Sequence, residues 1–171
     1  SDGLNLAAAG ITVGARGGIE TNPHMRTTNP SIWAAGDVTG RDQFVYMAAY
    51  GAKIAARNAV ADETRTYDNA TMPWVVFSDP QVAGVGLSEA QARAAGHEVV
   101  TSILPLDAVP RALAARDTRG LIKLLAEAES KRLLGAQILA PEGADSIQTA
   151  AMALKAGLTY EELGDTIMPY L

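Results

Sequence analysis

The sequence contains no cysteine. Disulfide bonds are therefore excluded, and so is any thiol chemistry carried out by these 171 residues alone. Charged residues supply only 19% of the chain, below the usual quarter. Hydrophobic residues supply 48%, which is enough for a folded core and argues against disorder.

Runs of basic residues and long apolar runs are also missing. The net charge is −5 and no more than two basic residues stand together, so nucleic acid is not an expected partner. No apolar run approaches the roughly 18 to 20 residues of a membrane span, so no membrane contact is expected. The first residues, Ser1 to Leu4, do not resemble a secretory signal. We therefore expect a cytoplasmic protein.

The first third of the sequence predicts an α/β unit. Residues 11–22 predict a hairpin around a turn-rich loop. The apolar run 32–35 has the length of a buried strand and ends at Gly36-Asp37. An alanine-rich helix is expected from about Phe44 to Val60. A polar stretch follows, and we expect a domain boundary there.

The remainder predicts an α+β unit, an antiparallel sheet with helices on one face, because a series of strands precedes two helices. Ser88–Gln91 and Thr159–Glu162 match the capping box that opens helices. Strands are expected at 74–77, 82–87, 99–104, 121–126 and 133–139, and helices at 88–96, 143–156 and from 159 onward.

Gly36-Asp37 is the pair of residues that bears most on function. Small residues at 34–36 allow a backbone to come close to a ligand. An aspartate just beyond a strand lies where open α/β sheets bind ligands, and its carboxylate accepts hydrogen bonds from sugar-like hydroxyls. The helix start near Phe44 offers unpaired N–H groups and a positive dipole end. The same residues also fit a simple turn or helix cap.

Two blocks of sequence resemble the FAD-dependent pyridine nucleotide-disulfide oxidoreductase family. Residues 25–28 together with 32–38 resemble its flavin-binding signature, and residues 76–86 resemble the opening of its dimerisation domain. The resemblance implies residues 1–61 are the C-terminal part of an FAD-binding domain. Residues 71–171 would be the dimerisation domain, truncated at its C-terminus. The family's glycine-rich FAD fingerprint, redox cysteines and nicotinamide domain are not in this sequence, so a fragment is expected.

The resemblance also implies site residues. Asp37 would bind the ribityl chain of FAD, with Gly36 allowing the close approach. Backbone N–H groups around Val45 and Tyr46 would lie near the pyrimidine edge of the flavin. A homodimer is implied, and we expect its surface within the region from about residue 72 onward. The alanine-rich segment 150–153 is a candidate for close packing against the partner.

Within the family, the chain is similar to the mercuric reductases. Most members carry His-Pro-Thr near the end, whereas this chain reads Met168 to Leu171 with Tyr170 at the histidine position, as mercuric reductases do. This implies a full-length enzyme that reduces Hg(II) with NADPH, which a domain absent from this chain binds. Tyr170 would be catalytic in the partner's site. Taken alone, Tyr170 fits an aromatic packing residue at a subunit interface better than a catalytic residue, and only the resemblance makes the catalytic role an equal alternative.

Two other interpretations stay open at this point. One is another member of the family, such as a dihydrolipoamide dehydrogenase. The other is a dimerisation module without chemistry, which the missing cysteines favour. We expect no metal site, because His24 and His97 have no second ligand at metal-binding spacing.

Overall fold

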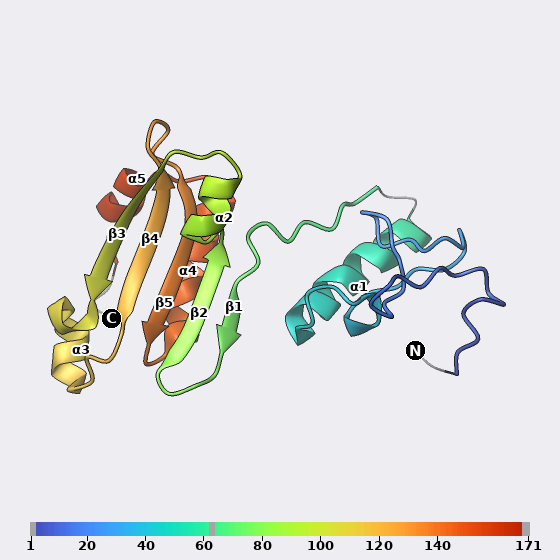
Figure 1. Ribbon diagram of the computed structural model, residues 1–171, viewed down its shortest axis with the longest axis horizontal. Helices are drawn as coiled ribbons and strands as arrows, with labels where there is room; N and C mark the ends of the chain where they lie inside the picture. The colour runs from blue at the N-terminus through green and yellow to red at the C-terminus, as the bar shows by residue number, and fades with distance from the viewer. Residues whose placement is uncertain (1–2, 62–63, 169–171) are drawn as a thin grey trace. The chain divides into compact units, whose positions relative to one another are not determined.

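The structure is a computed structural model that describes residues 3–61 and 64–168. The chain divides between Asp68 and Asn69 into two compact units (Figure 1), each of which is described by itself. Tyr170, the expected catalytic residue, lies outside the described residues.

The predicted hairpin at the start of the first unit is confirmed. Val13 and Ile19 form an antiparallel bridge. Between them, the Gly14 N–H donates to the Gly18 carbonyl over 2.8 Å, which closes the loop. Ile19 is buried in a small apolar cluster with Ile11 and Ala34. The hairpin therefore packs against the segment that leads into Gly36-Asp37.

The predicted strand at 32–35 is much reduced. It forms a single antiparallel bridge, between Trp33 and Arg26, and the Ala34 N–H donates to the Met25 carbonyl over 3.1 Å. No other segment in the described part of the chain forms a ladder with it. An apolar segment buries its side chains, but it becomes a strand only if another strand of matching length pairs with it. The local sequence pattern does not show whether such a pairing strand exists.

The expected helix is α1, Val45–Val60. Its buried residues recur at helical spacing. They are Met47, Gly51, Ile54 and Ala55. Ile54 and Ala55 pack with Met25, a fully buried residue of the preceding loop. Phe44 is the extended residue before the helix and provides no side-chain cap, so α1 as a whole relies on this packing for its stability.

The second unit is built on a five-stranded sheet whose strand order is β1-β2-β5-β4-β3 (Figure 1). Every neighbouring pair is antiparallel, as expected. The strands are β1 Trp74–Val76, β2 Gln81–Gly86, β3 Val99–Pro105, β4 Leu121–Glu127 and β5 Leu133–Ala140.

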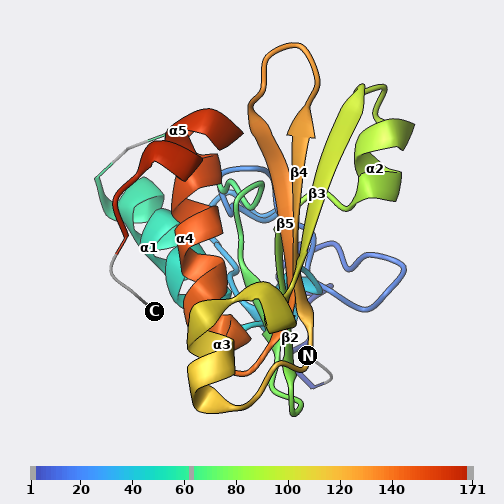
Figure 2. The same ribbon diagram turned by 90° about the vertical axis from the view of Figure 1, so that its left-hand side faces the viewer.

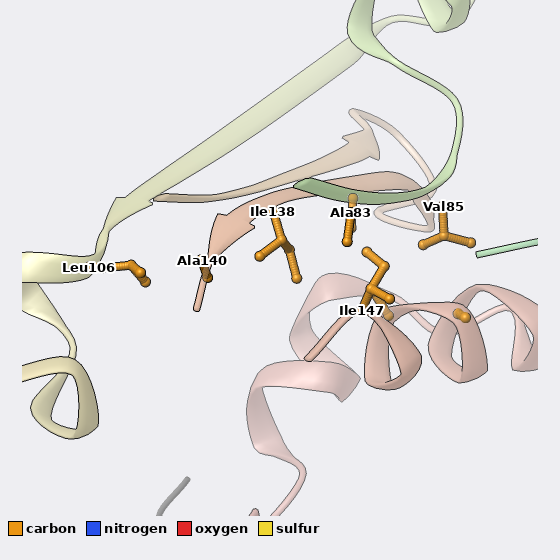
Figure 3. Close-up of a cluster of buried hydrophobic side chains, with 9 residues drawn as sticks. Ala83, Val85, Leu106, Ile138, Ala140 and Ile147 are labelled. Carbon is orange, nitrogen blue, oxygen red and sulfur yellow. The ribbon is translucent and has the colours of Figure 1, made fainter. Parts of the chain in front are cut away.

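Helix α4, Gly143–Ala156, covers one face of this sheet and closes the main core (Figure 3). Ile147 is 1% exposed and packs against Ala83 and Val85 of β2 and Ile138 of β5. These apolar residues alternate along their strands with residues that point to the other face, which is the two-residue period of a half-covered sheet.

The short helix α2, Glu89–Ala94, lies on the opposite side of the sheet from α4 (Figure 2). Its Ala92 packs with Val99 and Leu125, while Leu124, the next residue of β4, faces the α4 core. The expected arrangement with helices on one face therefore holds for α4, and α2 adds a small second layer. The predicted capping boxes are both present, at α2 and at α5, Tyr160–Asp165.

Two helical segments between β3 and β4 were not predicted. They are the 3-10 helix η2, Leu106–Ala108, and helix α3, Pro110–Ala115. Pro110 is the first residue of α3, where the missing N–H breaks no hydrogen bond of the helix. A proline is common at this position, so Pro110 was the feature of the sequence that could have indicated the start of α3.

The expectation that the segment 150–153 packs against a partner is wrong for its three alanines and stays a prediction for Met152. Ala150, Ala151 and Ala153 are at most 6% exposed, and the first two belong to the core between α4 and the sheet. Only Met152 points outward, with 66% of its surface exposed. Their small side chains bring α4 close to the chain's own sheet, so these alanines leave no surface for a second chain.

Candidate functional site

The site predicted from sequence is centred on the turn that follows residue 35. Gly36 has a φ of +79°, in the left-handed region that favours glycine. A Cβ at this position would lie 2.9 Å from the Ala48 Cβ of α1, closer than side-chain atoms ordinarily approach. Both backbone conformation and space therefore require glycine here. The turn continues into the 3-10 helix η1, Asp37–Thr39.

Neighbouring backbone holds this turn in place. The Thr39 hydroxyl and N–H both donate to the Gly36 carbonyl, over 2.8 and 2.9 Å. The Ile19 N–H of the hairpin donates to the Val38 carbonyl over 2.8 Å. Gly18 lies so close to the Thr39 backbone that any Cβ on Gly18 would overlap it. The turn is thus fixed between the hairpin and α1.

Asp37 presents an exposed side chain as the first residue of η1. Its backbone carbonyl accepts from the Gly40 N–H over 2.9 Å. Within residues 3–61 and 64–168, no donor hydrogen-bonds its carboxylate. The Asp37 carboxylate therefore does not cap η1, as the carboxylate of a simple turn residue would. It is available to accept hydrogen bonds from a ligand.

The first turn of α1 carries Val45, which is 88% exposed, and Tyr46, which is 45% exposed. No side chain caps this helix, so its N-terminal end keeps its positive dipole. The rings of Phe44 and Tyr46 stack with centroids 5.2 Å apart. Partial burial, and then the nearby Asp42 carboxylate, raise the pKa of Tyr46. Its phenol therefore stays neutral at physiological pH.

Sequence reasoning missed the contact between Asp42 and Tyr67. The Tyr67 hydroxyl donates to a carboxylate oxygen of Asp42 over 3.0 Å. Burial and this hydrogen bond raise the pKa of Tyr67 well above its usual range. The two residues are 25 positions apart, and Tyr67 also packs on Tyr50 of α1 with ring centroids 5.3 Å apart. The pair holds the chain leading into α1.

Arg26, Thr27 and Thr28, which belong to the flavin-binding signature, have a structural role. The Thr27 hydroxyl donates to the Ile32 carbonyl over 2.9 Å, and the Thr28 hydroxyl donates to the Gly10 carbonyl over 2.8 Å. The Arg26 guanidinium lies 5.2 Å from the centre of the Trp33 ring. These contacts brace the segment before Gly36, so their effect on a ligand is indirect.

These features fit the ribityl chain and ring edge of a flavin. Gly36 supplies a backbone surface that a larger residue would obstruct, and Asp37 supplies an acceptor for hydroxyl groups. The uncapped start of α1 supplies N–H groups for an electron-rich ring edge. The structure shows where Gly36, Asp37, Val45 and Tyr46 lie. Their roles in binding the flavin stay a prediction.

His24, His97 and other ionisable residues take part in surface contacts. His24 Nδ1 lies 3.0 Å from the Arg65 carbonyl, and His97 Nδ1 lies 2.9 Å from the Glu127 carboxylate. Arg111 lies 3.6 Å from Glu142. Arg119 pairs with Asp79, the residue before Pro80. Among the residues that the structure describes, no three His, Cys, Asp or Glu side chains form a group suited to a metal ion.

Comparison with known families accounts for both units. The dimerisation-domain model of the pyridine nucleotide-disulphide oxidoreductases matches residues 72–171, and a second model, pyridine nucleotide-disulphide oxidoreductase, matches residues 1–58. The chain belongs to the pyridine nucleotide-disulphide oxidoreductase family. As a member of this family it carries the antiparallel sheet and helices of a dimerisation domain after an α/β segment.

Individual members of the family agree with this assignment. The mercuric reductase of Bacillus cereus is 49% identical over 98% of this chain, which spans 27% of that protein. The mercuric reductase of Acidithiobacillus ferrooxidans is 50% identical over 98% of this chain and 30% of its own length. Among solved structures, the HOCl-induced flavoprotein disulfide reductase of Escherichia coli matches 98% of this chain with a TM-score of 0.90 at 35% identity. This chain covers 39% of that structure's chain.

The chain therefore spans about a third of the length of the curated relatives it matches. The resemblance to mercuric reductases, expected from the sequence, is confirmed along its whole length. In the described ranges, 3–61 and 64–168, this family member has no helix that is long and apolar enough to cross a membrane.

Proposed function

We propose that this chain contributes the flavin contact and the dimer-forming domain of a cytoplasmic, homodimeric FAD-dependent enzyme that reduces Hg(II) to Hg(0) with NADPH. The observation that supports it most is 46–50% identity with seven mercuric reductases over 98–100% of the chain. The overall reaction balances, because one hydride from NADPH supplies the two electrons that Hg(II) takes up.

The chain's own residues would bind and orient the flavin. The Asp37 carboxylate accepts hydrogen bonds from ribityl hydroxyls, and Gly36 lets the backbone come close. The N–H groups at the start of α1, around Val45 and Tyr46, stabilise electron density on the pyrimidine edge. When bound, FAD supplies the redox step between the nicotinamide and the substrate.

Hg(II) is a soft ion that prefers thiolate ligands. This chain has no cysteine, so the thiolates that bind Hg(II) come from outside these 171 residues. Tyr170, which lies outside the described residues, would act in the partner's site, where its phenol hydrogen-bonds or weakly ligates the incoming ion. Two-fold symmetry then gives each site one such tyrosine.

We expect the isolated 171-residue chain to show no Hg(II) reduction, because it has no cysteine and spans about a third of its relatives. The measurement is NADPH oxidation in the presence of Hg(II), with the full-length protein as the positive control. Turnover above background by the pure chain would contradict this view of the chain's role. Absence of turnover in the full-length protein would refute the proposed activity itself.

Replacing Tyr170 with phenylalanine in the full-length protein should lower Hg(II) turnover while FAD binding and the dimer stay intact, because only the hydroxyl is lost. A mixed dimer gives the sharper test. One subunit carries Tyr170→Phe, and the other lacks the redox cysteines but keeps Tyr170. The one cysteine-competent site then faces an intact tyrosine and should run at the wild-type rate per site. A rate equal to that of the Tyr170→Phe homodimer would place the tyrosine in its own subunit's site.

A further inference from the structure

Tyr67 is anchored to the first unit by contacts that do not involve its hydroxyl. Its N–H donates to the Pro23 carbonyl over 2.8 Å. Its ring packs on Tyr50 of α1, with ring centroids 5.3 Å apart. The ring also lies against Gly51, since a Cβ on that glycine would be 3.3 Å from the Cε2 atom of Tyr67. The position of the Tyr67 hydroxyl is therefore set by the backbone and by one face of α1.

The Tyr67 hydroxyl restrains the chain that enters α1. It donates to the Asp42 carboxylate over 3.0 Å in a partly buried setting. Asp42 lies shortly before Val45, the first residue of α1, and its carbonyl accepts from the Phe44 N–H over 2.7 Å. Burial, and then the hydrogen bond to Asp42, raise the pKa of Tyr67, so the phenol keeps its proton and remains a donor. Because α1 has no side-chain cap, this hydrogen bond restrains the helix entry where a cap ordinarily would.

The first turn of α1 packs against the turn that carries Asp37. A Cβ on Gly36 would be 2.9 Å from the Ala48 Cβ. The N–H groups around Val45 and Tyr46 are those proposed to face the pyrimidine edge of the flavin. A reduced flavin holds more negative charge at that edge than an oxidised one, and the effect of a helix dipole falls off within the first turn. A small shift of the helix start would therefore change the affinity for reduced FAD more than the affinity for oxidised FAD.

We propose that the hydrogen bond from Tyr67 to Asp42 positions the start of α1 and thereby raises the reduction potential of the bound FAD. The inference rests on the flavin contact of the proposed function and adds the two residues that position it. Tyr67 is a positioning residue, because it acts through Asp42 and the helix start. The Asp42 charge by itself would have the opposite effect, since a nearby negative charge disfavours the reduced flavin. Position and charge therefore change the potential in opposite directions.

The first test is Tyr67→Phe in the full-length protein, which keeps the ring and removes only the hydroxyl. The ratio of reduced to oxidised FAD affinity should fall about fivefold, the size of a typical interaction with a helix terminus. At about 30 mV per tenfold for a two-electron couple, the reduction potential falls by roughly 20 mV. Titration against a reference dye measures the potential, and circular dichroism checks the fold.

Tyr50→Phe is the matched control for this variant. The Tyr50 hydroxyl belongs to the same aromatic cluster, but it accepts from the Asp68 N–H over 3.3 Å, in the segment that follows α1. Its loss does not release the chain that enters the helix. The reduction potential of Tyr50→Phe should therefore equal that of the wild-type protein.

A pair of Asp42 variants separates position from charge. Asp42→Asn and Asp42→Ala both remove the charge, but only asparagine keeps an oxygen that accepts from the Tyr67 hydroxyl. The potential of Asp42→Ala should lie roughly 20 mV below that of Asp42→Asn, the same fivefold change in affinity ratio. Equal potentials for the two variants would show that only the charge acts, and would refute the proposal. This comparison also decides the question if Tyr67→Phe does not fold.

The remaining outcomes are distinguishable from one another. A full-length protein that binds no FAD refutes the proposed flavin contact, and the inference with it. If FAD binds and its potential is the same in the wild-type and Tyr67→Phe proteins, the positioning role alone is refuted. An equal fall in potential for Tyr67→Phe and Tyr50→Phe also contradicts the proposal, because the loss of any hydroxyl from the aromatic cluster would then disturb the helix.

Discussion

Replacing Asp37 with alanine in the full-length protein is expected to weaken FAD binding by about 10- to 150-fold. Asp37 is exposed at the start of η1, and no described donor uses its carboxylate. Loss of hydrogen bonds to a charged acceptor costs about 1.5–3 kcal/mol, and each 1.4 kcal/mol is a factor of ten in affinity. The fold should survive, since the backbone of the turn is held by Gly36, Thr39 and the hairpin.

The measurement is the FAD dissociation constant, obtained by titrating the apoprotein and following flavin fluorescence. Asp107→Ala is the matched control, because Asp107 is an exposed aspartate in the first turn of the other 3-10 helix, η2. Its removal should leave FAD affinity unchanged. An Asp37→Ala protein with wild-type affinity would show that Asp37 is only a turn residue, and the proposed flavin contact would then be wrong.

Replacing Ile147 with alanine should destabilise the second unit by about 2–5 kcal/mol, the usual cost of truncating a buried isoleucine. Ile147 is 1% exposed and lies between α4 and the sheet, against residues of β2 and β5 (Figure 3). The residues around it are mostly alanines with short side chains, which limits how far the core can close over the cavity. Such a loss is a large part of the total stability of a small domain.

Urea unfolding of the 171-residue chain, followed by circular dichroism, measures this change. Met152→Ala on the same helix is the control, because that side chain is 66% exposed and its truncation creates no cavity. The midpoint for Ile147→Ala should fall well below that of the control. Equal midpoints for the two variants would mean that α4 does not depend on this core.

Local sequence patterns determined most of the elements. Short apolar segments predicted the five strands to within one residue at each end. The capping boxes at Ser88 and Thr159 mark the starts of α2 and α5. These features succeed because side-chain periodicity and caps act over a few residues. For Gly36 the sequence indicated only a close backbone approach, and the positive φ was found in the structure. The family resemblance could also be recognised from the sequence, because each motif that carries it is a contiguous stretch of residues.

Contacts between distant residues were decided only by the tertiary structure. The Tyr67 hydroxyl reaches Asp42 across 25 residues, and Gly18 fits against the backbone of Thr39. The alanines of α4 were expected at a partner's surface and are buried in the chain's own core, because an apolar helix face does not specify which surface will cover it. The row of cross-strand partners Val76, Val82, Leu139, Leu121 and Pro105 exists only through the register of five strands. Each strand contributes one residue to it, and a single strand's sequence contains no information about its neighbours' register.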